Sequence, residues 1–173
     1  MRVQLAVEED VPAWLELARE VEPLFGPMAE DPGFARALRS NIARCSAFCV
    51  RQGDDPAPVP LLGAVLFDWR EAPRHHIRWL AVSANARRAG IGRALVERCL
   101  AGVRTPAEIA VVTFGAEVIG GAPARRLYES FGFAPAESEE RGPEGRTRQV
   151  FRMALERTAP RYDGDPATRR SLR

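Results

Sequence analysis

The chain has 173 residues and contains no lysine, so all 25 of its basic residues are arginine. This absence excludes a Walker-type phosphate-binding loop, whose last glycine is followed by lysine and then serine or threonine. The three cysteines, Cys45, Cys49 and Cys99, show no disulfide pattern, and their odd number favours a reducing, intracellular setting. No apolar run approaches the roughly 20 residues of a membrane-spanning helix, and the N-terminus lacks the apolar core of a signal peptide. We therefore expect a soluble, cytoplasmic protein.

Hydrophobic residues make up 46% and charged residues 28% of the chain, which is typical of a globular domain. The formal net charge is only +2, so charge alone demands no polyanionic partner and argues against nucleic-acid binding. The sequence predicts one domain over residues 1–156 and a polar, arginine-rich tail over residues 157–173. On a strand, Cys45 and Cys49 would lie about 13 Å apart, too far to share one metal ion. We interpret them as core cysteines and expect no metal.

Hydrophobic spacing predicts elements in the order β-α-α-β-β-β-α-β-α-β-β. The β-α-β crossover in the middle favours one parallel pair inside an otherwise antiparallel sheet. The apolar run "EIAVVTF" indicates a strand covered on both faces. The predicted fold class is therefore α/β (α+β): a mixed, mostly antiparallel central sheet of about seven strands flanked by about four helices. The expected strands are residues 3–7, 46–52, 61–69, 75–82, 108–114, 133–140 and 148–156, and the expected helices are residues 8–21, 34–45, 91–103 and 123–131.

The segment "RRAGIGRAL" (residues 87–95) lies between a predicted strand and a predicted helix. A helix start carries unpaired backbone N–H groups and the positive end of the helix dipole. Gly90 and Gly92 let the backbone pass close to a ligand, so that successive N–H groups converge on an anion such as a phosphate. Arg87, Arg88 and Arg93 add positive charge and bidentate donors. The pattern predicts a pyrophosphate cradle, and a plain turn with surface arginines is the structural alternative.

A dinucleotide-binding fingerprint fits the same segment poorly. It needs a third glycine or an alanine where Leu95 stands. It also needs an acidic residue about 20 positions further on, where "AVVTF" offers none. Spacing therefore argues against a nicotinamide or flavin dinucleotide as the ligand.

Two motifs in the second half of the chain resemble those of the GNAT superfamily of N-acetyltransferases. The family's loop, Gln/Arg-x-x-Gly-x-Gly/Ala, is met by Arg87, Gly90 and Gly92. Its later signature, roughly Ala-x-x-Leu-Tyr-x-x-x-Gly-Phe, is met by Ala124, Leu127, Tyr128, Gly132 and Phe133. The resemblance is clear over residues 77–133 and extends in strand order over residues 3–156. One position departs from the family's pattern: many members carry Asn where this chain has Gly121, which removes a side-chain contact to the donor.

The resemblance implies acetyl-CoA, or another acyl-CoA, as the donor. The loop N–H groups from about Arg88 to Arg93 would hold the CoA pyrophosphate. The backbone of the preceding strand would pair with the pantetheine arm like an added strand. The strands "IRWLAV" and "IAVVTF" would splay apart to admit that arm. The implied cofactor-binding residues are Leu80, Ala81, Val82, Arg87, Arg88, Ala89, Gly90, Ile91, Gly92, Arg93, Ala94, Gly121 and Tyr128.

The resemblance also implies the catalytic groups. Tyr128 is the candidate acid near the CoA sulfur, because a phenol with an ordinary pKa of about 10 stays protonated at pH 7. Its structural alternative is an aromatic packed beside Leu127 and Phe131. The candidate base is His76, with an ordinary pKa near 6.5, or an ordered water molecule. On an alternating strand, His76, Arg78 and Leu80 would share one side and His75 would point to the other.

The implied reaction is transfer of an acetyl group to a primary amine of a small-molecule or peptide acceptor, with no nucleic acid and no membrane as partner. Homodimers are common in the family. Three apolar residues, Phe25, Met28 and Phe34, would line the acceptor pocket or pack under the loop of residues 22–33. Glu22, Glu30 and Asp31 would attract a cationic amine. The alternative function is a catalytically weak CoA-binding sensor of the same fold, which Gly121 and the lack of an obvious carboxylate base favour.

Overall fold

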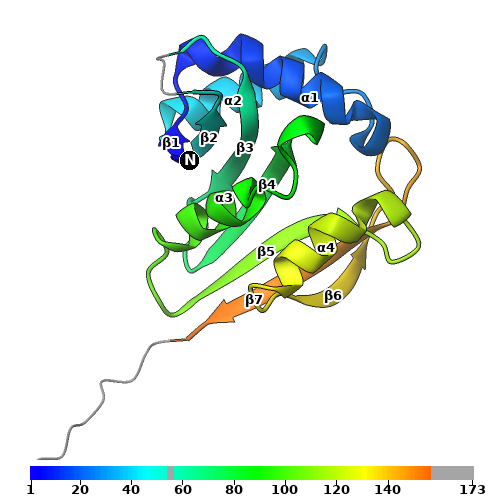
Figure 1. Ribbon diagram of the computed structural model, residues 1–173. Coiled ribbons are helices and arrows are strands. Elements are labelled where there is room, and N and C mark those ends of the chain that lie inside the picture. The colour runs from blue at the N-terminus through cyan, green and yellow to red at the C-terminus, as the bar shows by residue number, and fades with distance from the viewer. Residues whose placement is uncertain (54–56, 157–173) are drawn as a thin grey trace, which may run out of the picture.

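The computed structural model describes residues 1–53 and 57–156. They form one seven-stranded sheet in the order β1-β2-β3-β4-β5-β7-β6, in which β4 and β5 run parallel and the other neighbours antiparallel (Figure 1). The predicted element order and the mixed sheet are confirmed. The strands are β1 (Gln4–Leu5), β2 (Ala47–Arg51), β3 (Leu61–Asp68), β4 (Arg74–Val82), β5 (Ala107–Phe114), β6 (Ala134–Glu139) and β7 (Arg148–Leu155). The helices are α1 (Val11–Phe25), α2 (Pro32–Ala43), α3 (Ile91–Leu100) and α4 (Ala122–Glu129).

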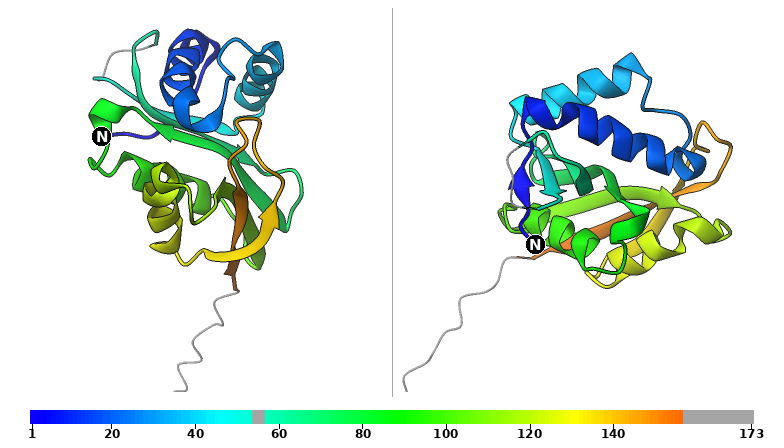
Figure 2. Two further views of the ribbon diagram at one scale, coloured as in Figure 1. Left: turned by 90° about the vertical axis from the view of Figure 1, so that its right-hand side faces the viewer. Right: turned by 45° about the horizontal axis from the view of Figure 1, so that its top comes forward.

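The sheet carries helices on both faces, as the two views of Figure 2 show. On one face, α1 and α2 pack against β2, β3 and β4, and Trp14 and Trp79 belong to this buried cluster. On the other face, α3 and α4 pack against the sheet, and Leu95, Ile109 and Phe151 belong to the second cluster. Successive side chains of a strand point to opposite faces, so the sheet separates two cores.

The parallel strands β4 and β5 separate partway along their length. Their pairing runs from Arg74↔Glu108 to Ile77↔Val111 and stops there. β4 nevertheless continues to Val82, paired with β3, and β5 continues to Phe114, paired with β7. We call the separated part, residues 78–82 of β4 and 112–114 of β5, the β4–β5 fork. The predicted splaying of these two strands is confirmed.

A bulge in β4 lies where the fork begins. Leu66 of β3 pairs with Trp79 and the next residue, Phe67, pairs with Ile77, so Arg78 is the extra residue. As a result Ile77 packs in the α3/α4 cluster and Trp79 in the α1/α2 cluster, although they are two positions apart. The predicted alternation is therefore wrong: Leu80 packs on the α3/α4 side and does not share a face with both His76 and Arg78.

The first two helices are shifted along the chain from their predicted positions, α1 toward the C-terminus and α2 toward the N-terminus. α1 runs through Pro23, placed in a loop by the sequence analysis, and ends at Phe25 before Gly26, whose φ is +89°. Proline costs a helix one hydrogen bond, but near the last turn packing of Phe25 against the core offsets that loss. α2 begins at Pro32 because the side chain of Asp31 accepts a hydrogen bond from the N–H of Gly33, as an N-cap does.

The burial of β5 and of the cysteines differs in part from what the sequence predicts. β5 is covered on both faces except at Val112, which is 50% exposed on the side opposite α3 and α4, where Ala110 and Phe114 are buried. Cys49 and Cys99 are buried, but Cys45 is exposed just after α2, so it is not a core residue. Within residues 1–53 and 57–156, no helix has the length and apolar character needed to cross a membrane. The predicted tail, residues 157–173, lies outside the described residues.

A buried ion pair fixes the start of α1 to the sheet. Asp10 is fully buried and Arg51 of β2 is nearly so. The Arg51 guanidinium donates two hydrogen bonds to the Asp10 carboxylate, at 2.8 and 2.6 Å, and a third to Gln4 at 3.0 Å. The carboxylate also accepts from the N–H of Val7. Asp10 precedes α1 but does not cap it with its side chain; its carboxylate neutralises a buried arginine.

We predict that Asp10→Asn destabilises the fold by about 3–5 kcal/mol, because it leaves the Arg51 charge buried without a counter-ion. Urea unfolding followed by circular dichroism measures the change. Glu16→Gln, which breaks an exposed Arg19–Glu16 pair on α1, is the control and should unfold at nearly the wild-type midpoint. Equal stability of Asp10→Asn and the control would contradict this role of Asp10.

Candidate active site

The glycine loop connects β4 to α3 at the open end of the fork. Gly90 is the N-cap of α3 and has φ +81°, and Arg88 also has a positive φ, +62°. A side chain at Gly90 would be strained by this backbone conformation, although nothing except Met1 lies near it. The loop therefore needs glycine at this position for its conformation and not for lack of space.

The first turn of α3 presents free backbone donors. The helical hydrogen bonds begin with the N–H of Ala94, which donates to the carbonyl of Gly90 at 3.0 Å. Within the described chain, no backbone carbonyl accepts from the N–H groups of residues 90–93. These four groups point along the helix axis toward its N-terminus, where the helix dipole is positive. The loop and helix start therefore form an anion-binding arrangement.

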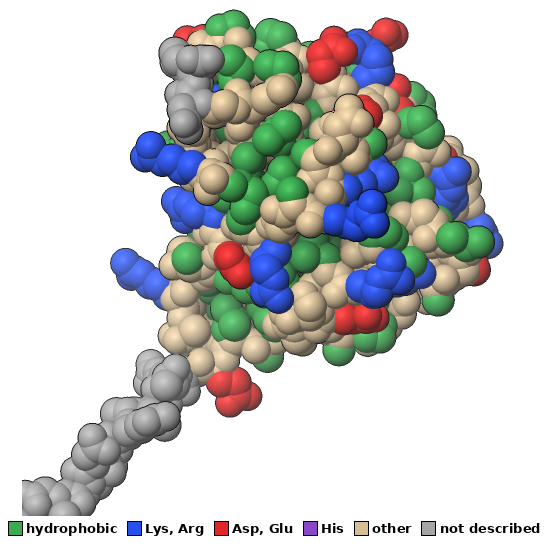
Figure 3. Space-filling model, viewed as in Figure 1, with side chains coloured by type: hydrophobic (Ala, Val, Ile, Leu, Met, Phe, Trp, Pro, Cys, Tyr) green, Lys and Arg blue, Asp and Glu red, His purple; other side chains and the backbone are tan. Residues whose placement is uncertain are grey.

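Three arginines surround this helix start and all are exposed. Arg87 reaches back to the carbonyl of Val82 at 3.5 Å. Arg93 lies 3.4 Å from Glu97 and stacks 4.9 Å from the ring centroid of Phe131. Basic side chains spread across the face that carries α3 and α4, whereas several acidic ones lie along the top over α1 (Figure 3). The local field at this face favours an anionic ligand.

The two GNAT-like motifs touch each other. A Cβ at Gly92 would meet the side chain of Leu127 at 3.1 Å and that of Val82 at 3.7 Å. Leu127 and Phe131 of the second motif therefore support Gly92 and Arg93 of the first. The glycine at position 92 lets α3 approach α4 closely, and α4 in turn fixes the position of the loop.

The strand part of the predicted donor site lies along the fork. Beyond Ile77, the edge of β4 that faces β5 has no strand partner among the described residues. Leu80 and Val82 pack partly buried on the α3/α4 side, and Ala81 is buried on the α1/α2 side. The backbone edge of residues 78–82 that faces β5 is thus without a strand partner in the described chain, as the strand-like binding of an extended ligand requires.

Tyr128 is buried on α4, 4% exposed, and its ring packs edge-on against Phe133 at 5.6 Å. Leu127 and Phe131 pack against the same buried cluster and also contact the glycine loop. Burial, with a smaller contribution from Cys99, raises the pKa of the phenol well above its ordinary value. The hydroxyl therefore stays protonated at neutral pH and remains a hydrogen-bond donor. The raised pKa also makes full transfer of its proton to an acceptor less favourable.

Gly121 is required by packing. It is buried, and a Cβ at this position would lie 2.4 Å from the Cβ of Phe114 and 3.0 Å from the guanidinium of Arg125. A Cβ–Cβ overlap cannot be relieved by a change of rotamer. An asparagine, frequent here in the family resembled, has no room in this chain, because Phe114 and Arg125 occupy the space.

Arg125 is a residue that the sequence analysis missed. Its guanidinium donates to the carbonyls of Phe114, Gly115, Ala116 and Val118 at 2.6 to 3.3 Å. These carbonyls belong to the end of β5 and to the loop that precedes α4. One side chain thus holds this loop together, three residues before Tyr128 on the same helix. Only its position directly after Ala124 in the motif hinted at a role.

His76 lies on the face opposite α3 and α4, in a group of charged side chains. Its Nε2 is 3.6 Å from Glu71, and Arg78 contacts both Glu71 and Asp68. Burial, followed by the Arg78 charge, lowers the pKa of His76, so the imidazole is neutral at pH 7. His75 points the other way, as predicted, and packs against Phe67 and Trp69 at the closed end of the fork.

The predicted acceptor residues mostly serve the structure. Phe25, Met28 and Phe34 are half-buried and pack against the α1/α2 cluster, and Phe25 also meets Phe114 edge-on at 5.1 Å. The Glu22 carboxylate accepts hydrogen bonds from the N–H groups of Met28 and Ala29. Asp31 caps α2 as described above. Of the three acids expected to attract an amine, Glu22 and Asp31 are therefore engaged in turns, and Glu30 is exposed.

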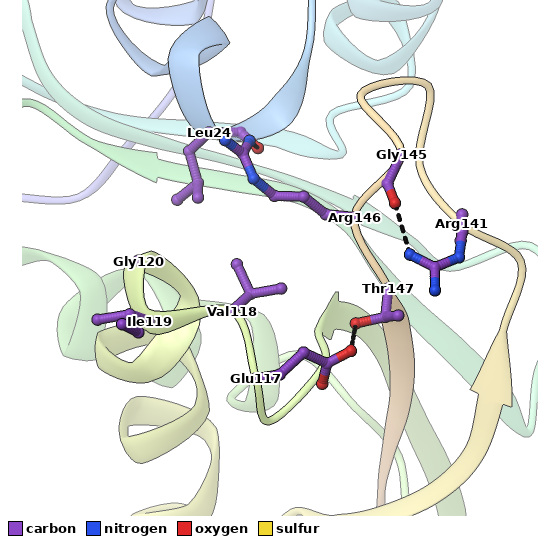
Figure 4. Close-up of a pocket in the computed structure, with 9 residues that line it drawn as sticks. All are labelled: Leu24, Glu117, Val118, Ile119, Gly120, Arg141, Gly145, Arg146 and Thr147. Atoms are coloured by element: carbon purple, nitrogen blue, oxygen red, sulfur yellow. Dashed lines mark hydrogen bonds between the residues drawn. The ribbon is translucent and has the colours of Figure 1, made fainter.

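A pocket of about 530 Å³ lies beside the open end of the fork (Figure 4). Its walls come from Leu24 near the end of α1, residues 117–120 of the β5–α4 loop, and Arg141 with residues 145–147 of the β6–β7 loop. Arg146 donates to the carbonyls of Pro23 and Leu24 at 3.0 and 2.6 Å, which ties the β6–β7 loop to α1. Three segments far apart in sequence thus meet around one pocket.

Comparisons with known proteins agree with this geometry. A sequence model described as "Acetyltransferase (GNAT) domain" matches residues 43–135. No curated protein sequence matches the chain. Solved structures of acetyltransferases share the fold. A GNAT-family acetyltransferase from Bacillus cereus has a TM-score of 0.68 at 16% identity, covering 90% of this chain and 98% of its own.

Two proteins whose names are more specific also have structures with this fold. Ribosomal-protein-alanine N-acetyltransferase from Brucella melitensis has a TM-score of 0.67 at 17% identity, covering 90% of this chain and 100% of its own. Naa50 of Arabidopsis thaliana, in complex with the bisubstrate analogue CoA-Ac-MVNAL, has a TM-score of 0.65 at 17% identity, covering 89% and 98%. The matched domain includes the glycine loop, β5 and α4, and the chain belongs to the GNAT family of acetyltransferases.

We predict that Gly121→Ala lowers the free energy of unfolding by about 1–3 kcal/mol, because the new methyl group overlaps the Cβ of Phe114. Gly120→Ala is the matched control: its methyl group meets only the flexible end of Leu24. Urea unfolding of both variants tests the assignment, and a similar loss of stability in the two would contradict it.

Proposed function

We propose that this protein transfers an acetyl group from acetyl-CoA to a primary amine by direct attack of the amine on the thioester. The observation that carries this proposal is the combination of four free N–H groups at the start of α3 with the unpaired edge of β4 in the fork. A pyrophosphate fits the first and an extended pantetheine arm fits the second. The complex of Naa50 with a CoA-peptide analogue supports the same donor.

The donor residues proposed are those of the fork and the loop. Residues 88–93 supply backbone donors, and Arg87, Arg88 and Arg93 supply charge. Leu80, Ala81 and Val82 offer the edge of β4. When bound, acetyl-CoA supplies the activated acetyl group, and the protein orients the thioester so that the amine attacks in a fixed geometry. Gly121 contributes no side chain and keeps the β5–α4 loop close to Phe114.

Tyr128 and His76 have the proposed catalytic roles. Tyr128 donates a hydrogen bond to the departing thiolate from the α3/α4 side of the sheet. His76, neutral at pH 7 because its pKa is lowered, accepts the amine proton from the opposite side, directly or through an ordered water molecule. The two residues lie on opposite faces of the sheet, which separates the leaving group from the attacking amine. Neither role requires a metal ion.

The first test is acetyl-CoA binding by calorimetry, with wild type against the double variant Gly90→Asp with Gly92→Asp. Wild type should bind and the variant should not, because two carboxylates repel the pyrophosphate and side chains fill the approach to the N–H groups. Gly53→Asp is the matched control, since Gly53 also has a positive φ, +80°, and no atoms near it. No binding by folded wild type would overturn the proposal.

Tyr128→Phe tests the proposed acid. The substitution removes one hydroxyl and keeps the ring that packs against Phe133. We expect kcat to fall about 10²-fold while the Kd for acetyl-CoA stays close to the wild-type value, because the hydrogen bond acts on the thiolate that forms during the reaction. Release of the CoA thiol with an amine acceptor measures kcat. An unchanged kcat would assign Tyr128 to packing alone.

A further inference from the structure

The pocket beside the fork is placed to receive the acceptor. Both parallel strands end at the open end of the fork, so the loop after β4 holds the donor and the loop after β5 lines the pocket. Gly120 touches Leu24 of α1, and Phe114 at the end of β5 touches Phe25 of α1. The pocket thus adjoins the end of β5 from the α1 side, opposite the glycine loop and α3.

The charge around this pocket is mainly positive. Arg141 is exposed and donates from one guanidinium nitrogen to the carbonyl of Gly145 at 2.8 Å (Figure 4); among the described residues its other nitrogens make no further hydrogen bond. Arg146 uses Nη1 for the α1 carbonyls. The one carboxylate that lines the pocket, Glu117, is hydrogen-bonded by the Thr147 hydroxyl. That hydrogen bond, with Arg141 and Arg125 nearby, lowers the pKa of Glu117.

The rest of the lining is apolar. Leu24, Val118 and Ile119 form one wall, and Ile119 is 89% exposed, the largest exposed fraction among the big apolar side chains described. Apolar side chains and the Arg141 guanidinium around one pocket fit a ligand that carries both a carboxylate and an apolar portion. A polyamine or another polycation would meet repulsion from Arg141 and Arg146.

We propose that the acceptor of this enzyme is an amine that carries a carboxylate, such as a peptide with an acidic side chain next to its N-terminal residue, and that Arg141 selects it. This inference rests on the proposed function and specifies its acceptor. The positive charge of this pocket is opposite to the negative charge that Glu22, Glu30 and Asp31 led us to expect around the acceptor. The carboxylates of Glu22 and Asp31 are engaged in turns. Arg141 acts on specificity and takes no part in the transfer step.

The test compares three peptide amides that differ at one position: Ala-Glu-Leu amide, Ala-Gln-Leu amide and Ala-Lys-Leu amide. Amidation removes the C-terminal carboxylate, so the side chain of the Glu peptide carries the only negative charge in the set. Wild type should have a kcat/KM for the Glu peptide about three- to tenfold above that for the isosteric Gln peptide, with the Lys peptide lowest. Raising the salt concentration should reduce this ratio, because the site is exposed.

Variants of Arg141 then locate the selection. Arg141→Gln should bring the ratio of the Glu to the Gln peptide close to one, and Arg141→Glu should make the Lys peptide the preferred acceptor. Arg36→Gln, which removes an exposed arginine of α2, is the matched control and should keep the wild-type ratio. All variants should bind acetyl-CoA like wild type, since Arg141 lies outside the glycine loop.

The outcomes separate the two proposals. Equal kcat/KM values for the Glu and Gln peptides in wild type, or a ratio unchanged by Arg141→Gln, would overturn the acceptor inference and leave acetyl transfer intact. Turnover of a polyamine such as spermidine, with none of the peptides, would do the same. Failure of folded wild type to bind acetyl-CoA would overturn the proposed function, and the acceptor inference with it.

Discussion

The separation of β4 from β5 is the constraint on which the rest of the site depends. Parallel strands that stop pairing in the middle of a sheet leave backbone N–H and C=O groups without partners, which is costly if they are buried away from water. The chain keeps the strands apart by holding each on its other side, β4 through β3 and β5 through β7. The bulge at Arg78 begins the divergence by reversing the faces of the residues that follow. The pairing of β4 with β3 and of β5 with β7 thus holds the facing edges of β4 and β5 apart without partners.

The sequence predicted the element order, the parallel pair and the glycine loop, because each depends on local pattern: apolar periodicity, a crossover, and glycines before a helix. It did not predict what depends on contacts between distant segments. The bulge at Arg78 changes the face of Leu80 without any sign in the spacing. Gly121 departs from the family's pattern for a reason visible only in three dimensions, the approach of Phe114. Glu22 and Asp31 had the right charge for binding an amine, but local turns use them first.

In this chain without lysine, single arginine side chains each hold several backbone carbonyls of the loops around the fork. Arg125 donates to four carbonyls at the end of β5, and Arg146 donates to two at the end of α1. A guanidinium presents several donors in a fixed plane, whereas an ammonium group is a compact, strongly hydrated charge. The loops around the fork are held by such multiple contacts, without regular secondary structure. Replacing either arginine with lysine would therefore be a large change, even though the charge is the same.

The β6–β7 loop shows how the two halves of the sheet are joined across the fork. Arg148 lies over the ring of Phe114 at 4.1 Å and pairs with Glu144 at 2.5 Å, and both side chains are nearly buried. A Cβ at Gly142 would lie within 2.6 Å of both groups, and Gly26, the residue after α1, also adjoins Glu144. The loop therefore needs small residues at these positions to hold a buried ion pair against α1. Since β7 pairs with β5 and α1 packs on β4, this contact links the two halves of the sheet on the α1 side of the fork.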